Sequence, residues 1–189
     1  ARGDLFADAL TAAPLAAMED APILLTASQR LDPETRRAIQ KLRPDTVVIL
    51  GGIQAISPNV EYQLRQMGIT VERISGANRY STAAQIAERV GLGVEAIVVN
   101  GEQFPDALSV SAYAAQAMIP ILLTKAQQLP EETLAAVERV EKTIVVGGEQ
   151  AVSSTVYKQL PQPRLIAGRD LFQTSVQVIE QLKMATVDV

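Results

Sequence analysis

The sequence predicts an α/β protein made of tandem small domains, each a parallel β-sheet flanked by helices. The first observation is a duplication: Gly3–Thr35 and Gly101–Thr133 align without a gap and share 16 of 33 residues. An offset of 98 residues is typical of a repeated small domain and too long for a solenoid unit. The second observation is that short apolar runs alternate with helical patterns, which indicates β-α units on a parallel sheet.

The duplication continues beyond these two segments with a shrinking offset. Val47–Gly52 recurs as Thr143–Gly148, and Gly76–Thr82 recurs in weaker form as Gly168–Thr174. The offset falls from 98 to 96 and then to 92 residues. Small deletions of this kind are tolerated in loops, so the copies are expected to share their core elements.

The first elements of a repeat are clearest in the second copy. Val94–Asn100 is a short apolar run ending at Gly101, which predicts a buried parallel strand. Asp106 begins an Ala-rich helix to Met118, where its carboxylate is expected to cap the first turn. Pro120 cannot continue that helix, so Ile121–Leu123 is predicted as the next strand.

The remaining elements follow in the same order in both copies. Asp32, Pro33 and Glu34 give a cap, a first-turn proline and an acid that complements the helix dipole, and Leu129–Thr133 starts the equivalent helix. The other predicted elements are strands at Thr143–Val146 and Val71–Ile74, and helices at Ser153–Leu160 and Ser81–Val90. Parallel strands joined this way require right-handed crossovers.

We divide the chain into three parts. Residues 1–72 form a first repeat that lacks its first strand and helix, 73–164 form a complete second repeat, and 165–189 begin a third. Val187–Val189 falls at the strand position that comes just before Ala1 two repeats earlier, so we hypothesise that the tail completes the first repeat, within this chain or from a neighbour. The chain opens inside a repeat, so we expect a fragment, and the lack of a signal peptide is uninformative.

Composition limits the chemistry. The chain has 189 residues, 48% of them hydrophobic, enough for one sizeable core or two small ones. It has no Cys, which excludes disulfides and thiolates, and no His, the commonest general base and metal ligand. A net charge of −4 disfavours a general nucleic-acid binder, and no run approaches the ~18 apolar residues of a membrane span. We therefore expect no cofactor, no metal, no nucleic-acid partner and no membrane span.

Four motifs stand in a fixed order along the chain. They are the segment 73–84 (Arg-Ile-Ser-Gly-Ala-Asn-Arg-Tyr-Ser-Thr-Ala-Ala), the segment 100–108 (Asn-Gly-Glu-Gln-Phe-Pro-Asp-Ala-Leu), the Pro-Ile-Leu-Leu-Thr strand, and Val-Val-Gly-Gly-x-x-Ala-Val-Ser. With these motifs the chain closely resembles the bacterial cell-wall-binding repeat type 2 family over essentially its whole length. The resemblance implies a small α/β repeat, usually present three times around a pseudo-threefold axis beside an enzymatic or adhesive domain.

The resemblance also implies a role for the Ile-Leu-Leu motif, which in that family is tied to polymer anchoring. Here the motif residues are Ile23, Leu24, Leu25, Ile121, Leu122 and Leu123. A continuous apolar run is equally typical of a covered parallel strand, so a purely structural role is the alternative.

Arg73, Arg79 and Tyr80 are the other contact candidates. Arginine can grip phosphate or carboxylate through two hydrogen bonds, and tyrosine can stack on a sugar face. The alternative for Arg79 is an ion pair between domains with Asp8 or Asp106. In the second copy Leu171 and Phe172 replace Arg79 and Tyr80, which argues against equal sites in every repeat.

The remaining polar candidates have structural explanations. Helix capping accounts for Asp8 and Asp106, so a carboxylate or metal site with Asp4 is disfavoured, and no catalytic residue is assigned. Gly51-Gly52 and Gly147-Gly148 lie between a strand and a helix, where a tight turn is favoured over an anion site.

The leading hypothesis is a non-catalytic module that anchors a surface or secreted protein to anionic wall polymers of Gram-positive bacteria. The expected location is extracellular, at the cell wall. An acidic chain needs a local basic cleft for this role, for which Arg73, Arg79 and Arg89 are the candidates. Two alternatives remain: self-assembly with neighbouring repeats or another copy as a surface layer, and a carboxylate or metal-dependent hydrolase.

Overall fold

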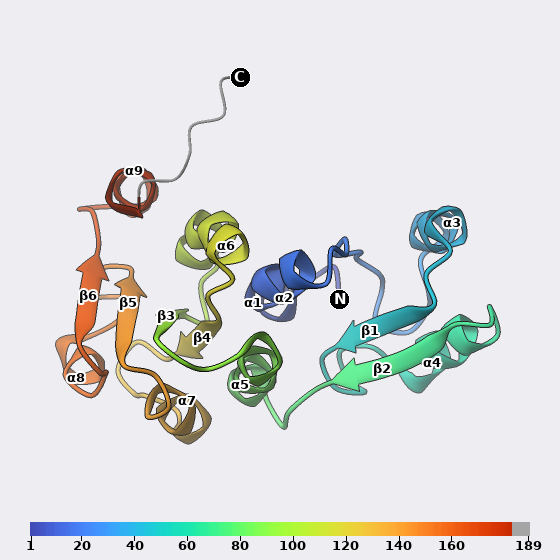
Figure 1. Ribbon diagram of the computed structural model, residues 1–189, viewed down its shortest axis with the longest axis horizontal. Coiled ribbons are helices and arrows are strands. Elements are labelled where there is room, and N and C mark those ends of the chain that lie inside the picture. The colour runs from blue at the N-terminus through green and yellow to red at the C-terminus, as the bar shows by residue number, and fades with distance from the viewer. Residues whose placement is uncertain (183–189) are drawn as a thin grey trace.

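Two parallel β-sheets lie at opposite ends of the molecule, with helices packed between them (Figure 1). The computed structural model describes residues 1–182. Every strand pairing in this range is parallel, and helices connect the successive strands. The predicted fold class, tandem parallel-sheet domains flanked by helices, is therefore confirmed.

The second unit has a complete sheet in the order β4-β3-β5-β6. The central strands β3 and β5 are apolar on both faces because α6 and α9 cover one face while α7 and α8 cover the other. In chain order its elements are β3 (Glu95–Asn100), α6 (Pro105–Ala117), β4 (Ile121–Thr124), α7 (Glu131–Val137), β5 (Lys142–Val146), α8 (Ser154–Tyr157), β6 (Pro163–Ile166) and α9 (Leu171–Leu182).

The first unit repeats this order without the first strand. Its elements are α1 (Ala7–Thr11), α2 (Ala13–Met18), α3 (Pro33–Leu42), β1 (Thr46–Leu50), α4 (Pro58–Arg65) and β2 (Thr70–Ile74). Helices α1 and α2 together correspond to α6, and β1 and β2 form a two-stranded sheet. Segment 22–26, the copy of β4, makes one isolated bridge, between Arg2 and Thr26. The sheet of the first unit is thus interrupted between segment 22–26 and β1.

Helix α5 (Arg79–Val90) lies between the two units and packs on both (Figure 1). The Asn78 side chain caps it by accepting hydrogen bonds from the amides of Tyr80 and Ser81. Ile86 packs in a cluster of the first unit, whereas Ala87 packs in a cluster of the second. One amphipathic helix therefore serves two hydrophobic cores.

The tail, residues 165–189, was predicted to complete the first unit. Strand β6 pairs with β5, and α9 packs on α6 and β6, so both elements belong to the second unit. Within one chain, residues 165–182 therefore cover the edge and face of their own sheet and do not complete the first unit, whereas completion of the first unit of a neighbouring copy stays a prediction. Residues 183–189, including Val187–Val189, lie outside the described residues.

The shared position of α5 predicts a large and global effect of truncating it. Ile86 is fully buried, so Ile86→Ala should lower the free energy of unfolding by roughly 2–5 kcal/mol. Ile53→Ala is the matched control, because Ile53 is 60% exposed and should tolerate the change. Chemical denaturation followed by circular dichroism measures both. Equal stability of the two variants would contradict a central role for α5.

Candidate functional site

The sequence-predicted polar residues gather where the strands end. All strands within a sheet are parallel, so the loops that follow them meet at one edge of each sheet, the usual place for binding residues in α/β folds. We call this the strand-end edge; it comprises the loops 51–57 and 75–78 of the first unit and 101–104, 125–130, 147–153 and 167–170 of the second. Equivalent side chains also meet here, since the Phe6 and Phe104 rings lie 5.9 Å apart between centroids.

Asp8 and Asp106 each face a glycine turn instead of capping a helix. The N-cap positions are Phe6 and Phe104, neither of which makes a side-chain cap, so the capping expectation is wrong. A Cβ on Gly147 would lie 2.6 Å from an Asp106 carboxylate oxygen, and the φ of Gly147 is +119°. Gly51 stands in the same relation to Asp8. Burial raises the pKa of both carboxyls. In each repeat, the aspartate motif and the glycine-pair motif therefore meet in a single contact.

Arg73 is occupied within the first unit. Its guanidinium donates to the Gly51 carbonyl at 2.8 Å and to the Glu61 carboxylate at 2.9 Å, and Glu61 also pairs with Arg65. Leu165 stands at the equivalent place in the second unit. Arg73 thus links β2 to β1 and α4. Both terminal nitrogens of its guanidinium are hydrogen-bonded within the protein and are not available to a polymer.

Arg79 and Tyr80 bind the two units together. The Arg79 guanidinium donates to the Gly101 carbonyl at 2.5 Å, and its charge faces Asp8. Tyr80 is buried beside Gly101, with the Lys125 ammonium 5.9 Å from its ring centroid. Burial, with Glu102 nearby, raises the pKa of the Tyr80 hydroxyl. The inter-domain interpretation therefore fits these residues better than stacking on a sugar.

The basic cleft that the sequence predicted from three arginines is not available to a polymer, because each guanidinium has a partner within the protein. Arg89 pairs with Glu72 at 2.9 Å and with Glu19 at 3.5 Å. Together with Arg73 and Arg79, its guanidinium is already used inside the molecule. The sequence missed these partners because they come from other elements of the fold.

The two Ile-Leu-Leu motifs lie in different surroundings. Residues 121–123 are buried in β4, as expected for a covered strand. In the first unit Leu25 is 50% exposed, while Ile23 and Leu24 are half-buried. The difference arises because α5 packs on β4, and within residues 1–182 segment 22–26 has no equivalent helix over it.

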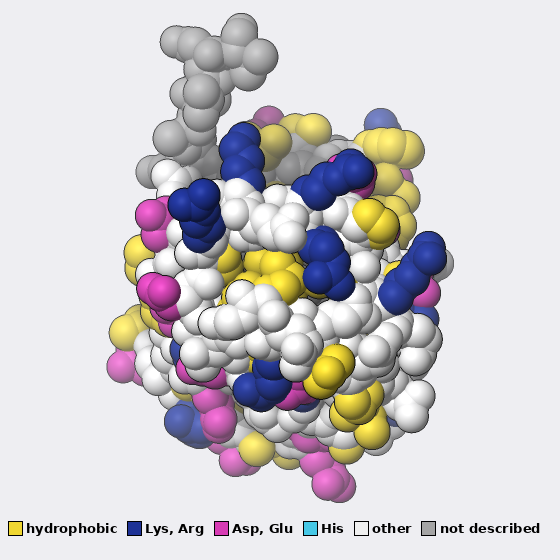
Figure 2. Space-filling model, turned by 90° about the vertical axis from the view of Figure 1, so that its right-hand side faces the viewer, with side chains coloured by type: hydrophobic (Ala, Val, Ile, Leu, Met, Phe, Trp, Pro, Cys, Tyr) yellow, Lys and Arg dark blue, Asp and Glu magenta, His cyan; other side chains and the backbone are white. Residues whose placement is uncertain are grey.

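Sequence reasoning missed a basic face on the first unit. Residues 36–43 hold four basic side chains, whereas the equivalent residues 134–141 hold one, Arg139. Arg30, Lys41 and Arg43 are exposed and make no salt bridge within residues 1–182. Figure 2 shows Lys and Arg side chains around a hollow with a hydrophobic floor on this end of the molecule. A comparison of charge between the repeats would have revealed it.

Catalytic arrangements gain no support from the geometry. Within residues 1–182, His, Cys, Asp and Glu form no group of three that could hold a metal ion. Asp4 pairs with Arg2 on the surface, while Asp8 and Asp106 face separate turns. No helix in that range is both long and apolar enough to cross a bilayer.

The paired aspartate and glycine motifs predict a specific sensitivity. Gly147→Ala should destabilise the protein by about 1–3 kcal/mol, because the new methyl group would meet the Asp106 carboxylate in a strained backbone conformation. Gly93→Ala is the control, since a Cβ there meets open space. Thermal unfolding measures both; a Gly147→Ala variant as stable as the control would refute the contact.

Comparison with known proteins places this geometry among wall proteins. The sequence matches the family "Cell wall binding domain 2 (CWB2)" over residues 1–61 and 73–157. It is 37% identical over 186 residues to the N-acetylmuramoyl-L-alanine amidase LytC of Bacillus subtilis and 39% identical over 184 residues to the amidase enhancer of the same organism. These alignments cover 97% and 96% of this chain, but only 38% and 25% of the relatives.

The fold has a close match among solved structures. Cwp6 from Clostridium difficile superimposes with a TM-score of 0.89 at 28% identity, covering 96% of this chain and 31% of that one. The paired repeats, the two Asp-Gly contacts and the shared helix thus accompany a family match across most of the sequence. The chain belongs to the cell wall binding domain 2 family.

Proposed function

We propose that this chain is a non-catalytic module that anchors a longer surface or secreted protein to anionic polymers of a bacterial cell wall. Membership in a cell-wall-binding family supports the binding role. The chain corresponds to 38% of an amidase and 25% of an amidase enhancer, which supports a separable module beside other domains. Attachment to a Gram-positive wall and an extracellular location follow from this proposal.

The observation that carries the proposal is the group of exposed basic side chains on and beside α3. The net charge of −4 repels an anionic polymer at long range, so binding requires a local excess of positive charge. The exposed cations Arg30, Lys41 and Arg43 on and beside α3 provide one. Figure 2 shows several Lys and Arg side chains gathered on the end of the molecule that carries the first unit, where a polyanion can contact several at once.

Charge reversal on α3 tests this proposal. Lys41→Glu with Arg43→Glu should weaken retention on purified Gram-positive walls about tenfold at low salt, because two attractive contacts become repulsive. The matched control is Lys158→Glu with Arg169→Glu, which changes the net charge equally on the second unit. A pull-down on walls with and without their anionic polymers measures the effect.

The control separates the possible outcomes. Selective loss for the α3 pair, with weak binding to walls stripped of anionic polymer, supports the proposal. Equal losses for both pairs would assign the effect to net charge alone. Full retention of both variants would contradict an electrostatic contact with an anionic polymer.

A second candidate function, docking of repeats on one another, is favoured by the exposed face of α9. Helix α9 is the copy of α5, and Phe172 and Ile179 stand at the positions of Tyr80 and Ala87. Tyr80 and Ala87 are buried, and α5 packs on β4 and α7, whereas Phe172 is 75% exposed. An unpartnered apolar helix face of this kind is typical of a protein-contact surface.

The charges around this face support the same partner. At the α5–α7 contact, Arg139 pairs with Glu88 at 2.6 Å. Their counterparts are Lys41 on α3 and Glu180 on α9. A second copy that placed its α3 and segment 22–26 on α9 would cover Leu25 and restore that ion pair.

This docking predicts self-association of the isolated chain at high concentration. Phe172→Glu with Ile179→Glu should make it monomeric, because two charges would replace apolar contacts. Gln173→Glu with Gln177→Glu on the same helix is the control, because their counterparts in α5, Ser81 and Gln85, belong to neither hydrophobic cluster of the second unit. Sedimentation velocity over a concentration series measures the mass. A chain that stays monomeric throughout would contradict this candidate.

A further inference from the structure

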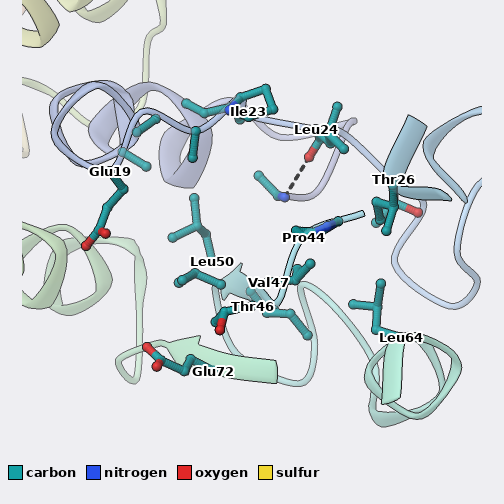
Figure 3. Close-up of a pocket in the computed structure, with 18 of the residues that line it drawn as sticks. Glu19, Ile23, Leu24, Thr26, Pro44, Thr46, Val47, Leu50, Leu64 and Glu72 are labelled. Atoms are coloured by element: carbon teal, nitrogen blue, oxygen red, sulfur yellow. Dashed lines mark hydrogen bonds between the residues drawn. The ribbon is translucent and has the colours of Figure 1, made fainter. Parts of the chain in front are cut away.

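The outer face of α4 presents an exposed tyrosine. Tyr62 is 60% exposed, whereas the other tyrosines of the chain are buried or half-buried. Val60 and Leu64 of the same helix belong to a hydrophobic cluster of the first unit, and Leu64 points from α4 toward the interior (Figure 3). Because an α-helix turns once in about 3.6 residues, Tyr62 lies on the side opposite these two. Its ring therefore faces the solvent and is not part of that cluster.

The neighbours of Tyr62 on the helix surface suit a sugar ring. Pro58 lies one turn before Tyr62 and Gln66 one turn after it, and both are exposed. The C–H groups of a sugar ring pack on the electron-rich face of an aromatic ring. Its hydroxyl groups need hydrogen-bond donors and acceptors, and an amide side chain such as that of Gln66 supplies both. The outer face of α4 thus combines a flat apolar surface with an uncharged polar group at its border.

The helix that carries Tyr62 lies beside the basic helix α3. Gln63, the residue after Tyr62, accepts a hydrogen bond from the Arg36 guanidinium of α3 at 2.6 Å. This bond joins the two helices, and the exposed cations Lys41 and Arg43 lie on and at the end of the neighbouring one. A polymer that crosses both helices would therefore contact positive charges on α3 and an aromatic ring on α4.

The second unit lacks both features at the equivalent places. Lys158 stands at the position of Tyr62, although the buried Val60 recurs as the buried Val156. The basic residues of α3 likewise have one basic counterpart in residues 134–141. The fold of a repeat therefore does not require the tyrosine, and the exposed ring occurs in the same unit as the exposed cations. This pairing of a ring with charges on adjacent helices indicates one contact surface.

We propose that Tyr62 is a stacking site for a sugar ring of the wall polymer, next to the cations of α3. The inference rests on the proposed function, because it adds a sugar contact to the binding of an anionic polymer. It names the ligand as a polymer that carries sugar rings as well as anionic groups. The two contacts differ in their response to salt. Charge attraction at the surface is screened within about 3 Å at 1 M salt, whereas burial of apolar surface is not.

The experiment measures retention of the full chain on purified Gram-positive walls at low salt and at about 1 M salt. Tyr62→Ala should weaken retention roughly three- to tenfold at both concentrations, because the stacking surface is lost. Tyr62→Phe keeps the ring and should bind as the unaltered chain does. Lys158→Ala, at the equivalent position of the second unit, is the matched control and should leave retention unchanged at 1 M salt. Circular dichroism checks that each variant is folded, as expected for exposed positions.

The outcomes separate this inference from the proposed function. A loss with Tyr62→Ala at both salt concentrations, and none with Tyr62→Phe, supports the stacking site. Retention of Tyr62→Ala equal to that of the unaltered chain at about 1 M salt would overturn it, and so would an equal loss with Tyr62→Phe. The pair Lys41→Glu with Arg43→Glu acts at low salt alone, so its effect there tests the polyanion contact independently of Tyr62.

Discussion

The architecture depends on α5, a helix that two hydrophobic cores share. Its small residues Ala83, Ala84 and Ala87 let neighbouring elements approach closely, while Ile86 fills the first unit. Neither unit is self-sufficient, since the first needs this helix over β2 and the second needs it over β4. The two units therefore form one cooperative body, in which Arg79 at the start of the helix fixes the orientation by holding the Gly101 carbonyl.

Local patterns explain why the fold could be predicted from the sequence. The duplicated apolar runs predicted β1, β2, β3, β4 and β5, whereas segment 22–26, the first copy of β4, makes only an isolated bridge. The burial of Ile121, Leu122 and Leu123 follows from a run that is covered on both faces. Asp32 caps α3 as predicted, because the amide that it accepts a hydrogen bond from, that of Glu34, lies only two residues away in the chain. Signals of this kind extend over a few residues, so they can be read from the sequence without knowledge of the tertiary structure.

The candidate site was predicted less well because its partners are distant in sequence. Arg73 reaches Glu61 and Gly51, and Asp106 meets Gly147, forty-one positions later in the chain. No local sequence pattern indicates these contacts. Arginines that resembled ligand-binding residues therefore make hydrogen bonds within the protein. The basic side chains of α3 are the converse case. Their signal lies in the difference between two copies that otherwise share their core, since surface residues of a repeat can diverge without disturbing its packing.

The contact of Phe6 with Phe104 has a consequence for length. Equivalent residues in a linear array are separated by a full repeat, so contact between them indicates that the copies are related mainly by rotation about an axis near the two rings. Adding copies by the same operation would curl the molecule around that axis. Rotation without translation closes after a few copies, so a module built this way is compact, and a domain joined to it stays close to the axis.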